Sequence, residues 1–66
     1  MYDALKAHFA AKRRRALANL ANYIHDSVGV GEHPDVVGEA IKLVEDVDHA
    51  DSCLETLSKY SSQLKM

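Results

Sequence analysis

The sequence has 66 residues, 47% of them hydrophobic, with one cysteine and a formal net charge of −2. This length fits one domain over 1–66, and the single Cys53 excludes an internal disulfide, which favours a reducing, cytoplasmic setting. No stretch is apolar enough for a membrane span, and the early basic residues do not fit a signal peptide.

The first predicted element is an amphipathic helix over residues 2–27. Neither glycine nor proline interrupts this segment, and its many alanines favour a helix. Apolar residues recur at helical spacing along one face. They are Tyr2, Leu5, Phe9, Ala16, Leu20, Tyr23 and Ile24, with Leu17 at the edge. Arg13 falls on the same stripe, so we expect it to face a partner helix.

A turn is predicted over residues 28–33. Gly29 can adopt the left-handed conformation that closes a helix, and Pro34 suits the first position of the next one. Neither role requires Glu32 or His33. Because loops on rigid helices often carry recognition, we predict that these two side chains are exposed at the tip and contact a partner protein.

The second predicted helix covers residues 34–62 and has the 4-3 spacing of a helix packed as in a coiled coil. The positions are Val36, Ala40, Leu43, Val47, Ala50, Leu54, Leu57, Ser61 and Leu64. Two helices joined by a short loop pack antiparallel, which predicts an all-α helical hairpin. The basic run Lys12–Arg15 then lies opposite acidic residues 45–51, and we expect Arg13 to pair with Asp51.

Three further apolar residues, Val37, Ile41 and Val44, widen the face of the second helix beyond the stripe that one partner covers. Burial of such side chains is worth about 1.5–3 kcal/mol each. We therefore expect self-association, as a homodimer that forms a four-helix bundle, with these residues at the oligomer interface.

The basic run "KRRR" gives an alternative function, nucleic-acid binding through Lys12, Arg14 and Arg15. An ion-paired or solvated face is favoured instead, because no aromatic residue is interleaved for base stacking and the acidic segment lies opposite. We accordingly expect no nucleic-acid partner. A third function comes from "HPD", His33-Pro34-Asp35, which resembles the tripeptide of J-domain co-chaperones. The characteristic aromatics and the extra N-terminal helix of that family are absent.

Other chemistry has little support in the sequence. "GVGE" lacks the Gly-Lys-Ser/Thr end of a phosphate loop, and Glu32 would repel phosphate. Glu45, His49 and Cys53 share a helix face, but a zinc site needs four ligands. A hairpin offers no cleft for acid–base catalysis. We expect no enzyme activity, no catalytic residues, no cofactor and no metal.

The turn "VGVGEHPD", the acidic amphipathic helix after it, and the opening "MYDALKAHF" resemble a family of very small helical proteins of T4-like tailed phages of marine cyanobacteria. The family has no assigned activity and no catalytic residues to transfer. The resemblance implies a phage accessory protein acting inside an infected bacterial cell. The leading expectation is thus a non-enzymatic interaction protein whose partner is a host or phage protein, without membrane association.

Overall fold

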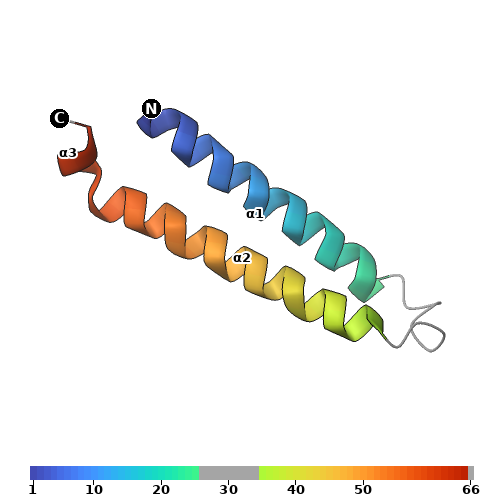
Figure 1. Cartoon of the computed structure of the whole chain (residues 1–66). Coiled ribbons are helices and arrows are strands. Elements are labelled where there is room, and N and C mark those ends of the chain that lie inside the picture. The colour runs from blue at the N-terminus through green and yellow to red at the C-terminus, as the bar shows by residue number, and fades with distance from the viewer. Residues whose placement is uncertain (26–34, 66) are drawn as a thin grey trace.

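The computed structural model shows two long helices that lie side by side and run in opposite directions (Figure 1). The structure describes residues 1–25 and 35–65. Helix α1 covers Tyr2–His25, α2 covers Asp35–Lys59, and a short α3 covers Ser61–Leu64. The predicted all-α antiparallel hairpin is therefore confirmed. The predicted turn at 28–33 lies outside the described residues.

The predicted 4-3 positions form the face of α2 that packs against α1. Every one of these positions from Val36 to Ser61 is buried or half-buried, and only the last, Leu64, is exposed. Among residues 1–25 and 35–65, the buried ones are Ala16 of α1 and Ala50 and Leu57 of α2. Small side chains at two of these three positions allow close approach of the helix axes.

The apolar stripe predicted on α1 is only partly covered. Tyr2, Phe9, Leu20 and Tyr23 are half-buried, whereas Leu5 and Ile24 are exposed. A single neighbouring helix covers a narrow stripe, so apolar residues at its margins remain in contact with water.

The hairpin is a rod with principal extents of 52 × 14 × 14 Å and an accessible surface of 5208 Å². A compact protein of 7.3 kDa would expose about 4,200 Å². The two helices therefore leave much more surface in water than a globular chain of this mass.

The helix predicted over 34–62 is interrupted at Tyr60, whose backbone has φ −107° and ψ 20°. The Tyr2 hydroxyl donates a hydrogen bond of 3.1 Å to the Leu57 carbonyl. In a continuous helix this carbonyl would accept from the Ser61 N–H. Regular bonding resumes where the Leu64 N–H donates to the Tyr60 carbonyl at 2.9 Å. Tyr2 thus joins the start of α1 to the end of α2.

Replacement of Tyr2 by Phe removes this hydrogen bond and keeps the ring. We expect Tyr2→Phe to lower the free energy of unfolding by about 0.5–1.5 kcal/mol, the net value of one hydrogen bond. Chemical denaturation followed by circular dichroism measures this change. Tyr60→Phe is the matched control, because the Tyr60 hydroxyl makes no hydrogen bond within the described residues. Equal effects of the two substitutions would contradict the assignment.

Candidate interaction surfaces

An ion pair marks one edge of the contact between α1 and α2. The Arg13 Nε donates to the Asp51 Oδ1 at 2.5 Å, and the two side chains are 47% and 50% exposed. The predicted pairing is confirmed. Half-exposed pairs contribute only about 0.2–1 kcal/mol, so the pair matters mainly as a marker of which residues lie opposite each other.

The other members of the basic run do not all lie on one face of α1. Lys12 is half-buried, while Arg14 and Arg15 are exposed and make no ion pair within the described part of the chain. Successive helical residues point about 100° apart. Lys12 and Arg15 are three residues apart and so are neighbours on the helix surface, whereas Arg14 points about 100° away from Arg15. The three candidate nucleic-acid contacts therefore do not form a single line that could follow a phosphate backbone.

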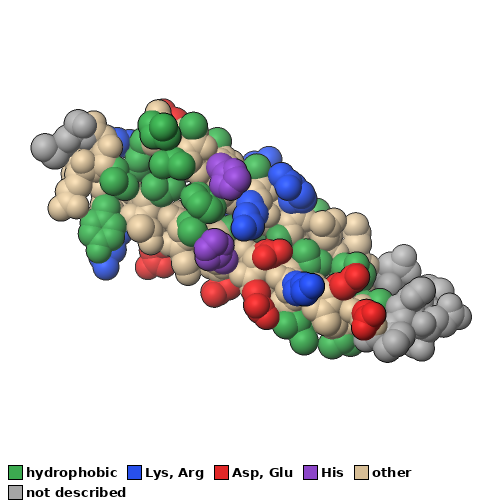
Figure 2. Space-filling view, viewed as in Figure 1, with side chains coloured by type: hydrophobic (Ala, Val, Ile, Leu, Met, Phe, Trp, Pro, Cys, Tyr) green, Lys and Arg blue, Asp and Glu red, His purple; other side chains and the backbone are tan. Residues whose placement is uncertain are grey.

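Charge is divided unequally between the helices. Helix α1 carries five basic residues and one acidic residue, whereas α2 carries two basic and seven acidic residues. On the face in Figure 2, charged side chains of both signs spread over the middle of the molecule and towards the start of α2, while hydrophobic side chains gather towards the termini and along the lower edge near the start of α2. Each helix therefore presents a surface of one dominant sign.

The three residues predicted at an oligomer interface are exposed on α2. Val37 is 59% exposed, and Ile41 and Val44 are each 53% exposed. Val44 and Val37 precede Asp51 by one and two heptads, so they lie on the same edge as the Arg13–Asp51 pair.

Two residues of α1 extend this apolar surface. Leu17 and Ile24 are 37% and 64% exposed, and they follow Arg13 by four and eleven residues. This spacing places them on the edge that carries Arg13. We call the set Leu17, Ile24, Val37, Ile41 and Val44 the exposed apolar face. Ile24, predicted on the apolar stripe of the first helix, and Leu17, predicted at its edge, belong to this exposed face instead. Helical periodicity alone does not separate a second apolar stripe from the first.

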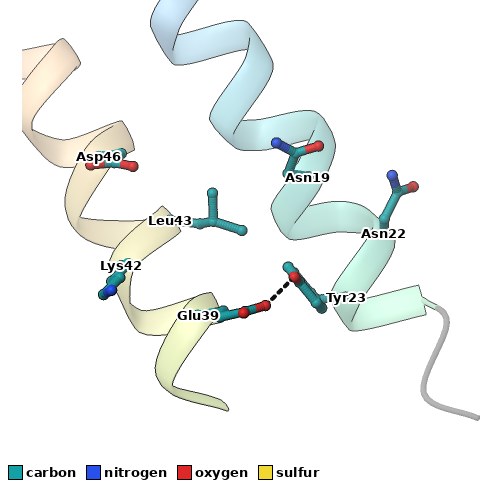
Figure 3. A pocket seen from close by; sticks show the side chains of 7 residues that line it. All are labelled: Asn19, Asn22, Tyr23, Glu39, Lys42, Leu43 and Asp46. Atoms are coloured by element: carbon teal, nitrogen blue, oxygen red, sulfur yellow. Dashed lines mark hydrogen bonds between the residues drawn. The ribbon is translucent and has the colours of Figure 1, made fainter. Parts of the chain in front are cut away.

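The opposite edge holds an open, polar groove (Figure 3). Its lining residues are Asn19, Asn22, Tyr23, Glu39, Lys42, Leu43 and Asp46. The Tyr23 hydroxyl donates a hydrogen bond to the Glu39 carboxylate across the groove. This bond raises the pKa of Tyr23 above its ordinary value of 10.0, and partial burial and the negative charge of Glu39 add to the increase. The groove combines two amides with charges of both signs.

This hydrogen bond predicts a pH dependence. Because the pKa of Tyr23 is higher in the folded than in the unfolded chain, its stabilisation is present below pH 10.0 and lost as the pH rises through the raised pKa. We expect Glu39→Ala to return the pKa of Tyr23 towards its ordinary value in an alkaline NMR titration. Glu45→Ala removes an exposed carboxylate elsewhere on α2 and should leave it unchanged. An unaltered Tyr23 titration in Glu39→Ala would refute the assignment.

The remaining candidates form no assembled site. The His49 Nε2 lies 3.7 Å from the Cys53 Sγ, both on α2. Within residues 1–25 and 35–65, no three His, Cys, Asp or Glu side chains are grouped closely enough to hold a metal ion. The predicted partner contacts Glu32 and His33 lie outside the described residues, as does Pro34, while Asp35 is the first residue of α2.

None of the described helices combines the length and apolarity needed to cross a bilayer. Comparisons with protein-family models, with curated proteins and with solved structures give no match.

Proposed function

We propose that this chain is a non-enzymatic helical interaction protein that dimerises into a four-helix bundle through the exposed apolar face. The observation that carries the proposal is the exposure of Val37, Ile41 and Val44, each more than half accessible. They lie beside a hairpin interface in which only three of the described residues are buried. Contiguous exposed apolar surface commonly marks a protein–protein contact. A second copy would cover it and supply the core that one hairpin lacks.

The biological setting is part of the same proposal. The chain is an accessory protein of a tailed phage and acts in the cytoplasm of an infected bacterial cell on a host or phage protein. Its support is the resemblance of "VGVGEHPD" and the following acidic helix to small proteins of cyanobacterial phages.

Sedimentation equilibrium tests the dimer. We expect the parent chain to be dimeric at micromolar concentration. Val44→Asp would place an unpaired charge in the contact and should raise the dissociation constant at least about tenfold. Ser52→Asp, which adds the same charge at an exposed position of α2, should leave it nearly unchanged. A folded, monomeric parent chain at this concentration would rule out the proposal.

Nucleic-acid binding is the second candidate function, favoured by the exposure of Arg14 and Arg15 without ion-pair partners in the described part of the chain. The acidic charge of α2 opposes it, because phosphates would approach both helices of so thin a rod. The J-like co-chaperone function ranks third, because the aromatic residues characteristic of that family are absent from the sequence.

A binding assay at several salt concentrations separates the first two functions. A protein that contacts a few phosphates shows a log–log slope of about −2 to −4 between affinity and salt. We expect no measurable binding to DNA or RNA at physiological salt. Tight, salt-sensitive binding that Arg14→Ala and Arg15→Ala abolish would establish the nucleic-acid function instead.

A further inference from the structure

The exposed apolar face contains a second heptad seam. Leu17 and Ile24 are seven residues apart on α1, and Val37 and Val44 are seven apart on α2. A spacing of seven keeps side chains on nearly the same line along a helix. Each line lies beside the seam that joins α1 to α2, on the edge that the Arg13–Asp51 pair marks. The surface is thus two parallel apolar lines, one from each helix.

We propose that a second copy of this chain covers the exposed apolar face. The two copies are related by a two-fold rotation axis that runs parallel to the long axis of the hairpin. Helix α1 of each copy then packs against α2 of the other, and the two copies of His25 and of Asp35 lie at the same end of the dimer. This arrangement rests on the dimer proposed above and specifies its orientation and contacts.

The register within one hairpin determines the register between copies. Arg13 lies opposite Asp51, and Tyr23 lies opposite Glu39. Rotation about an axis parallel to the hairpin does not change the position of a residue along the rod, which we call its height. Ile24 therefore lies level with the partner's Val37, and Leu17 lies level with the partner's Val44. Apolar side chains meet apolar side chains at both heights, where each is exposed in the single chain.

Charge also favours this orientation. The mainly basic α1 faces the mainly acidic α2 of the other copy. Arg14, three residues before Leu17, and Asp48, four after Val44, both flank the exposed apolar face and are exposed. They are at the same height, so Arg14 pairs with the partner's Asp48. A two-fold axis perpendicular to the hairpin would instead place α1 on α1 and α2 on α2, bringing acidic helices together.

The contact area gives the same preference. Helices α1 and α2 have 24 and 25 residues, so each offers a face about 36–38 Å long to a second copy. The perpendicular axis, centred on the apolar residues, would overlap only about half of that face. The parallel axis uses its full length.

Distances between spin labels on two copies distinguish the orientations. The label is attached at Ala4→Cys or at Ala18→Cys in a Cys53→Ser chain. Ala4 and Ala18 are exposed on α1 two heptads apart, about 21 Å along the helix. With the parallel axis, both sites give similar inter-copy distances, each within about 30 Å for helices packed 8–10 Å apart. A distance about 40 Å longer at Ala4 than at Ala18 would establish the perpendicular axis and overturn the inference. A monomer by sedimentation would overturn the dimer itself.

Charge reversal tests the cross-subunit pair independently. We expect Arg14→Glu or Asp48→Arg alone to raise the dimer dissociation constant roughly three- to tenfold, and the double variant to recover most of the parent affinity. Arg15→Glu is the matched control: it makes the same charge change four residues before Asn19, on the groove edge, and should change the constant by less than about twofold. Circular dichroism checks that each variant keeps its helices. Additive losses in the double variant would contradict the pairing of Arg14 with the partner's Asp48.

Discussion

The close packing of α1 against α2 along one narrow seam is the constraint on which the rest of the molecule depends. Ala16 and Ala50 are buried in this seam and allow the helix backbones to approach closely. Because the seam is narrow, each helix buries only a small part of the apolar surface of the other. Side chains a quarter of a turn from the seam remain in water, so the geometry that forms the hairpin also creates its apolar surface.

The 4-3 spacing of α2 and the Arg13–Asp51 pair were predictable, because helical periodicity and antiparallel pairing determine both. The interruption of the helix at Tyr60 was not predictable from the sequence. It involves Tyr2, at the other end of the sequence, whose hydroxyl donates a hydrogen bond to a carbonyl of α2. Periodicity also could not show that Ile24 is exposed. The apolar stripe of one helix does not show how much of it a neighbouring helix buries, whereas the structure does.

The two edges of the hairpin differ in chemistry, which is why the proposed contact uses one and not the other. The groove edge carries Tyr23 and Glu39, already hydrogen-bonded to each other, and charges of both signs. Water solvates such groups well, and covering them would leave polar atoms in need of new partners. Association removes the apolar side chains of the exposed apolar face from water, and this transfer is favourable.

The bond between the Tyr2 hydroxyl and the Leu57 carbonyl also bears on the response of the molecule to mechanical load. The start of α1 and the end of α3 lie at the same end of the rod (Figure 1), so tension applied between them pulls across the seam rather than along it. Under that geometry the helices separate layer by layer, starting at Tyr2, as in unzipping. Resistance to pulling is therefore concentrated in a few contacts at the open end, and a single phenolic hydroxyl is among the first to bear the force.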